Sequence, residues 1–268
     1  MMRNEQIATR LAEMGEASSA GPARIPTTGI READALVGDL ANHPHAFVLA
    51  CIMDRQVKAA RAWAIPYLMS RRLGGFDFVL LASLSSSDIH RAMAEPRPLH
   101  RYVEMMSRNF YDGIHLIATD YAGDASRIWS HRPSSAELIY RFHQFRGVGH
   151  KIASMAANIL ARDFKIPLSD YSSIDVSADL NVRRVFQRLG LAHGDDSTDE
   201  VIYRARSLHP KFPGLLDGPT WEIGRGWCHA ADPDCGACYM NDLCPTAATK
   251  ELGSLEPGAD GRTHRGTG

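Results

Sequence analysis

Four of the five cysteines stand close together near the C-terminal end of the sequence. Cys228, Cys235, Cys238 and Cys244 fall within 17 positions (228 to 244), separated by six, two and five residues, while Cys51 lies alone in an apolar stretch. Thiolates at this density can converge on one centre and select zinc or an iron–sulfur cluster. Only one close Cys-x2-Cys pair is present, whereas structural zinc usually takes two. We therefore expect a thiolate site, with iron–sulfur favoured over zinc, and a buried Cys51.

A glycine-containing turn is the second candidate site. Gly147 and Gly149 flank Val148 between two segments of helical periodicity, and Lys151 follows directly. Glycines let backbone N–H groups turn outward at the start of a helix, which creates an anion site suited to a DNA phosphate. The segment therefore predicts two helices joined by a phosphate-binding hairpin.

Helices are expected to position both sites. Apolar residues recur at spacings of three and four from about residue 30 almost to the cysteines, and strand-like alternation is hardly visible. Serines such as Ser134 and Ser197 open several of these segments as N-caps. An all-α fold is predicted. The segments expected to be helical are 31–43, 45–73, 85–94, 100–122, 134–145, 150–164, 177–190 and 197–210.

The overall charge points to no particular partner. Thirty basic residues oppose 31 acidic ones, for a formal charge of −1. Two local runs are basic: residues 55–72 hold five basic residues and no acid, and residues 141–165 hold five basic residues and one acid. No apolar run is long enough for a membrane span and no signal peptide is evident. We expect a soluble, cytoplasmic monomer, associated with the nucleoid if the source is bacterial.

Three motifs together resemble the iron–sulfur branch of the helix-hairpin-helix DNA glycosylase superfamily, the endonuclease III-like proteins. The cysteine spacing is similar to that of the family's [4Fe–4S] loop. The hairpin Gly147–Ala153 reads GVGHKIA, close to the family's Gly-Val-Gly-Arg-Lys-Thr-Ala, although Phe145 and Arg146 replace its Leu-Pro. The segment Asp179–Val185, DLNVRRV, fits the family's Asp-x-(Asn/His)-apolar-x-Arg-Val.

The resemblance implies two helical domains with a DNA-facing cleft between them. Residues 45–165 would form a six-helix barrel that contains the hairpin, and residues 166–246 would form the iron–sulfur cluster domain. Residues 1–44 would pack with the cluster domain. Residues 247–268 would form a disordered tail.

The resemblance also assigns roles to residues. Lys151 would be the amine nucleophile and Asp179 the catalytic carboxylate, with Asp175 as the alternative carboxylate. Gln56, in the segment CIMDRQV, would fill the gap left by an extruded nucleotide. The other implied DNA contacts are Arg146, Gly147, Gly149 and His150, and the implied ligands of the [4Fe–4S] cluster are Cys228, Cys235, Cys238 and Cys244.

The expected activity is excision of a damaged or modified base from double-stranded DNA, followed by strand cleavage through a lysine Schiff base. Two alternatives stay open: a glycosylase that uses Asp-activated water, and a DNA-binding module without catalysis. Lys151 and Asp179 are 28 positions apart (179 minus 151), about ten more than the family usually has. The absence of a glutamate before Gln56 argues against removal of mismatched adenine. The base itself is not determined; oxidised pyrimidines are the default by resemblance.

Overall fold

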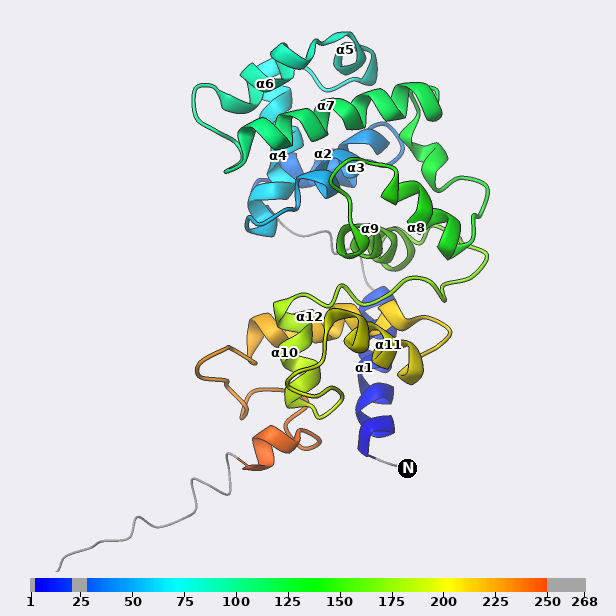
Figure 1. Ribbon diagram of the computed structural model, residues 1–268, viewed down its shortest axis with the longest axis vertical. Helices are drawn as coiled ribbons and strands as arrows, with labels where there is room; N and C mark the ends of the chain where they lie inside the picture. The colour runs from blue at the N-terminus through cyan, green and yellow to red at the C-terminus, as the bar shows by residue number, and fades with distance from the viewer. Residues whose placement is uncertain (1–2, 21–27, 250–268) are drawn as a thin grey trace, which may run out of the picture.

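The computed structural model describes residues 3–20 and 28–249, and every regular element in these ranges is helical. The predicted all-α fold is therefore confirmed. The helices form two lobes, one above the other in Figure 1. Within the described ranges no helix is long and apolar enough to cross a membrane.

The upper lobe, here called the hairpin lobe, is built around a helix that is buried on every side. In α3 (Pro44–Met53) all ten residues are buried, because α2, α4, α7, α9 and a short 3-10 helix surround it. Cys51 is part of this core, as predicted. The elements of the hairpin lobe are α2 (Arg31–Gly38), α3, α4 (Ala59–Leu73), α5 (Phe78–Ser83), α6 (Ser86–Ala94), α7 (Val103–Asp120), η1 (Ala125–Ile128), α8 (Ser135–His143) and α9 (His150–Arg162).

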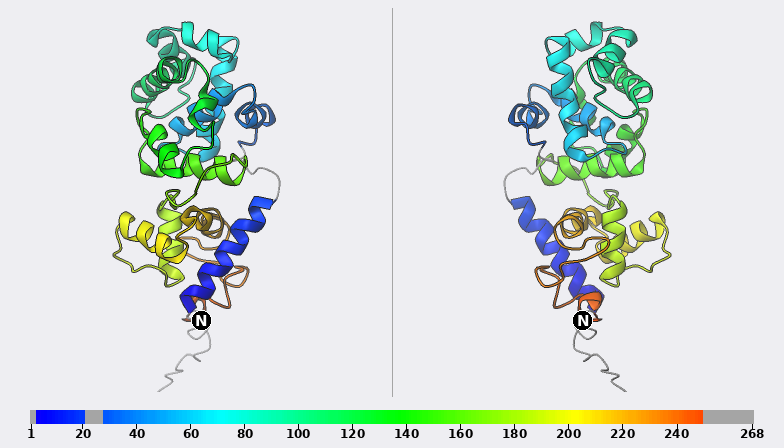
Figure 2. Two further views of the ribbon diagram at one scale, coloured as in Figure 1. Left: turned by 90° about the vertical axis from the view of Figure 1, so that its right-hand side faces the viewer. Right: turned by 90° about the vertical axis from the view of Figure 1, so that its left-hand side faces the viewer.

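The lower lobe, here called the cysteine lobe, combines the first helix with the C-terminal third of the chain. Figure 2 shows α1 lying along this lobe in both views, where it packs on η2 and α12. Arg10 of α1 also forms two contacts of 2.5 and 3.0 Å with the carboxylate of Asp242. The elements are α1 (Arg3–Ala20), α10 (Leu180–Arg188), α11 (Thr198–Leu208), η2 (Pro213–Leu216), α12 (Asp217–Gly226) and the cysteine segment 228–244.

Two expectations about the N-terminal part of the chain need correction. Residues 1–44 do not pack as one unit with the cysteine lobe, because Val37 of α2 belongs to the core of the hairpin lobe. The predicted helical segment 45–73 is two helices, separated by residues 54–58. The break lies at Gln56, whose φ of 52° is left-handed and cannot continue an α-helix.

The change from one lobe to the other comes later than the predicted boundary at 165. The segment after α9 folds back on the hairpin lobe, where Ser169 donates its backbone N–H to the carbonyl of Pro133 at 3.0 Å. Ile174 still belongs to the core of the hairpin lobe, and Val176 is the first residue after it in the core of the cysteine lobe. Of the predicted disordered tail, 247–249 are helical and 250–268 lie outside the described residues.

Candidate active site

The predicted hairpin joins α8 to α9, and buried side chains hold it in place. Phe145 is 1% exposed and Val148 6% exposed, and both belong to the core of the hairpin lobe. Phe145 stacks on Tyr121 with ring planes 6° apart. The phenylalanine that replaces the family's leucine therefore supports the entry to the turn by aromatic packing.

The two glycines of the hairpin have different structural roles. Gly147 has a φ of +84°, and a Cβ atom there would lie 2.4 Å from Nδ2 of the buried Asn109. Glycine is thus required at Gly147 by both backbone conformation and space. Gly149 is the N-cap of α9, its backbone is extended, and a Cβ atom there would meet nothing within 4 Å. The unpaired N–H groups of the first turn of α9 therefore begin at an open face.

Lys151 and Asp179 lie at the starts of two helices that belong to different lobes. Lys151 is exposed in the first turn of α9. Asp179 is the N-cap of α10, where its Oδ1 accepts hydrogen bonds of 2.9 Å from the backbone N–H groups of Asn181 and Val182. The N-cap role and a catalytic role are compatible, because Oδ1 makes both capping bonds and Oδ2 makes neither.

Asp54 brings these two groups together, and the sequence analysis missed it. It is the half-buried residue that ends α3. Burial raises the pKa of the Asp54 carboxyl, the positive charge of Lys151 lowers it, and the negative charge of Asp179 raises it. One carboxyl thus experiences the charges of both predicted catalytic residues. An acidic residue directly after ten buried positions, and two residues before Gln56, is the signal that could have identified it.

The loop after α3 reaches the hairpin. Arg55 approaches the carbonyl oxygen of Gly147 with its Nη1 at 3.5 Å. Gln56 is exposed and its side-chain oxygen accepts a 2.7 Å hydrogen bond from the hydroxyl of Tyr102. The predicted gap-filling glutamine therefore projects from the same region as the hairpin, on a loop whose left-handed backbone presents it to solvent.

The other predicted DNA contacts have protein partners. Arg146 is exposed but forms a 3.1 Å ion pair with Asp112 of α7. His150 directs its Nε2 to Asp175 at 3.2 Å. Asp175, the alternative catalytic carboxylate, is fully buried and binds Arg206 through both of its oxygens. Asp179 is thus the better candidate, because Asp175 has no accessible oxygen to offer a substrate.

The four clustered cysteines line one pocket in the cysteine lobe. Burial raises the pKa of the Cys238 thiol, and the three other thiols raise it further, so the four groups are close. All four are free cysteines. Within the described residues no three His, Cys, Asp or Glu side chains are arranged to hold a single metal ion. Four converging thiols that do not form a single-ion site fit the larger [4Fe–4S] group better than tetrahedral zinc.

Arginines of α10 hold the cysteine segment. Arg188 contacts Sγ of Cys228 at 3.4 Å and donates hydrogen bonds to the carbonyls of His229 (2.6 Å) and Ala230 (2.8 Å). Arg184 donates a 2.7 Å hydrogen bond to the carbonyl of Cys228. The helix that begins at Asp179 is thereby attached to the predicted cluster loop.

Comparisons with known proteins agree with the motifs. No family model matches the chain. Endonuclease III of Synechocystis sp. is 32% identical over 38% of this chain and 42% of the relative, and endonuclease III of Rickettsia conorii is 33% identical over 37% of this chain and 42% of the relative. The matched region thus spans less than half the length of either curated relative.

Solved structures resemble the chain over more of its length. A non-covalent endonuclease III–DNA complex has a TM-score of 0.61 with 18% identity, covering 94% of this chain and 100% of that one. A thermostable thymine-DNA glycosylase has a TM-score of 0.60 with 13% identity, covering 92% and 97%. At these identities the similarity shows a shared fold. The resemblance to the endonuclease III-like helix-hairpin-helix proteins is therefore confirmed.

Proposed function

We propose that this endonuclease III-like chain is a DNA glycosylase that excises a damaged or modified base from double-stranded DNA and then cleaves the strand as an AP lyase. One observation carries the proposal. The charges of Lys151 and Asp179, which come from different lobes, both act on Asp54 at the end of α3. A lysine and carboxylates gathered next to a phosphate-binding hairpin are the groups that covalent base excision requires.

The hairpin and the loop after α3 would bind the DNA. Backbone N–H groups at Gly149 and in the first turn of α9 would hold a phosphate, since the turn presents them at an open helix start. Gln56 would occupy the space left by the extruded nucleotide, because a base inside the stack keeps its glycosidic carbon out of reach. Arg146 would exchange Asp112 for a phosphate.

The chemistry would use the neutral amine of Lys151. Its Nζ lone pair would attack C1′, and the glycosidic bond would break with its electrons leaving on the base. The carboxylate of Asp179 would stabilise the positive charge that develops on the sugar. Asp54, whose pKa is raised by burial, is suited to accept a proton from the attacking amine. Loss of a second proton would give the Schiff base, and removal of a C2′ proton would expel the 3′ phosphate by β-elimination.

The four cysteines would hold a [4Fe–4S] cluster. When bound, the cluster cross-links Cys228, Cys235, Cys238 and Cys244 and so fixes the segment between them. Arg184 and Arg188 would pass that order to α10, because they join the segment to the helix that begins at Asp179. The cluster is thus proposed as a structural support with no part in the steps above.

Borohydride trapping on duplex DNA with one abasic site tests the proposal. The wild-type protein should form a covalent adduct, Lys151→Ala should form none, and Asp179→Asn should form it more slowly. Lys211→Ala is the matched control, since Lys211 is an exposed lysine in the connection between α11 and η2.

Three other results would each select a different function. Absence of an adduct with the wild-type protein would refute the lyase step. Base release by Lys151→Ala at the wild-type rate would identify a glycosylase that uses Asp-activated water. DNA binding without base release from any of a panel of oxidised, alkylated and mismatched bases would identify a binding module. The same panel would define the substrate.

A further inference from the structure

A buried carboxylate lies where the chain passes from one hydrophobic core to the other. Ile174 packs in the core of the hairpin lobe, Val176 packs in the core of the cysteine lobe, and Asp175 stands between them with none of its side chain exposed. A charged side chain at such a position is costly unless strong partners compensate for its lost hydration. Its partners therefore show what the position does.

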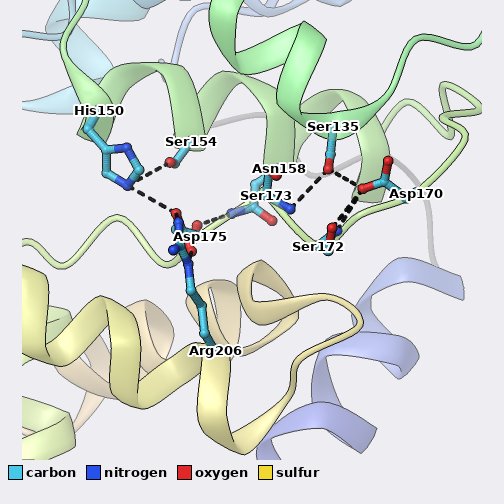
Figure 3. Close-up of polar contacts among 9 residues, drawn as sticks. All are labelled: Ser135, His150, Ser154, Asn158, Asp170, Ser172, Ser173, Asp175 and Arg206. Carbon is cyan, nitrogen blue, oxygen red and sulfur yellow. Dashed lines mark hydrogen bonds and ion pairs between the residues drawn. The ribbon is translucent and has the colours of Figure 1, made fainter.

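The partners of Asp175 come from both lobes, as Figure 3 shows. Arg206 of α11, in the cysteine lobe, donates hydrogen bonds of 2.7 and 2.8 Å to the two carboxylate oxygens. His150, the first residue of α9 in the hairpin lobe, places its Nε2 3.2 Å from Oδ2. Asn158 of α9 donates a 3.1 Å hydrogen bond to the Asp175 backbone carbonyl. Asp175 thus connects the hairpin to the opposite lobe.

The carboxylate is ionised in this arrangement. Burial acts to raise the pKa of Asp175, but hydrogen bonds from His150 and Arg206 outweigh it and the net pKa is lowered. An ionised carboxylate can only accept hydrogen bonds, so Nε2 of His150 must carry a proton. The contact consequently fixes the direction of the imidazole ring as well as its position.

The bridge also lies next to both proposed catalytic groups in the sequence. His150 directly precedes Lys151, and Asp175 lies four residues before Asp179. Lys151 and Asp179 belong to different lobes, so their separation depends on how the hairpin is held against the cysteine lobe. The resemblance offers no counterpart for this histidine, because the family's hairpin carries arginine there.

We infer that Asp175 is a positioning residue which, by binding His150 on one side and Arg206 on the other, sets the Lys151 amine at the distance from Asp179 that the reaction needs. The inference rests on the proposed function. It differs from a purely stabilising role in one respect: weakening the bridge should slow the chemical step in protein that remains folded and bound to DNA. A misplacement of about 1 Å can cost roughly a hundredfold in rate.

Variants of the two partners test the inference without removing the buried carboxylate. His150→Ala and Arg206→Ala each break one side of the bridge, and both side chains are 40% exposed, which favours folded variants. His150→Gln keeps an N–H donor and is the conservative replacement. His143→Ala is the matched control, since His143 is exposed and its ring stacks on that of His150 with centroids 6.4 Å apart.

Three quantities are measured for each protein: the single-turnover rate constant of borohydride trapping at saturating abasic DNA, the Kd for that DNA, and Tm. His150→Ala and Arg206→Ala should each lower the trapping rate constant about tenfold to a hundredfold. The double variant should be no slower than the slower single variant, because both act through Asp175. His150→Gln should recover most of the rate, and His143→Ala should match the wild type.

The inference is overturned if His150→Ala traps within twofold of the wild-type rate, if its whole defect is in Kd, or if the rate falls only in proportion to the unfolded fraction. A defect in Kd alone would make His150 a DNA contact. Failure of the wild-type protein to trap DNA would instead refute the proposed lyase. Hydrogen exchange of residues 147–153 would then decide the matter, because His150→Ala must speed exchange there if the bridge holds the hairpin.

Discussion

Replacing Gly147 by alanine should destabilise the hairpin lobe, whereas the same replacement at Gly149 should cost little. The left-handed φ of +84° at Gly147 costs an alanine about 1–2 kcal/mol. The new Cβ would lie 2.4 Å from Nδ2 of Asn109, which is 2% exposed and has no room to withdraw. Forcing a methyl group into a packed site costs about 1–3 kcal/mol more. We therefore expect Gly147→Ala to lose about 2–4 kcal/mol.

Gly149→Ala is the control within the same turn. Its backbone is already extended and a Cβ atom there meets nothing within 4 Å, so only the weaker N-capping ability of alanine remains, about 0.5–1 kcal/mol. The new methyl group would, however, point into the face where a phosphate is proposed to bind. Its effect should therefore fall mainly on the affinity for DNA.

Thermal unfolding followed by circular dichroism, and DNA binding followed by fluorescence anisotropy at fixed salt, separate the two effects. At about 2–4 °C per kcal/mol for a chain of this size, Gly147→Ala should lower Tm by roughly 5–15 °C. Gly149→Ala should lower Tm by at most about 4 °C and weaken DNA binding several-fold. Equal Tm values for Gly147→Ala and the wild type, or a larger loss for Gly149→Ala, would refute the reasoning about the turn.

Two further perturbations follow from the contacts of the cysteine lobe and the lobe junction. Arg188→Ala should speed the loss of iron and sulfide from the purified protein, because it frees Cys228 Sγ and two carbonyls; Gln187→Ala, one position earlier, should not, and equal iron contents would contradict the proposed support. Asp175→Asn should lower stability near neutral pH by about 3–5 kcal/mol. Because the folded pKa of Asp175 is lowered, this deficit should persist above the unfolded value near 3.9 and shrink as pH falls below it. A deficit that does not change between pH 7 and pH 3 in urea titrations would exclude an ionised Asp175.

The helical fold and the parts of the site were predictable from the sequence because they depend on local patterns. Spacings of three and four identify amphipathic helices, a Gly-x-Gly turn before Lys151 identifies a hairpin, and the cysteine spacing identifies one loop. The failures were also local in origin. The break at Gln56 was missed because the apolar pattern continues through it, although its backbone is left-handed.

Only the tertiary structure decided which residues face one another. Asp54 and Asp175 look equally plausible in the sequence, yet one lies between Lys151 and Asp179 and the other is enclosed by His150 and Arg206. The placement of α2 in the hairpin lobe likewise depended on packing between segments. The physical reason is that periodicity reports the face a residue presents, whereas the partner on that face comes from a distant segment. The sequence by itself determined the helices, the hairpin and the cysteine loop, and the fold decided how two lobes bring an amine and three carboxylates to one junction.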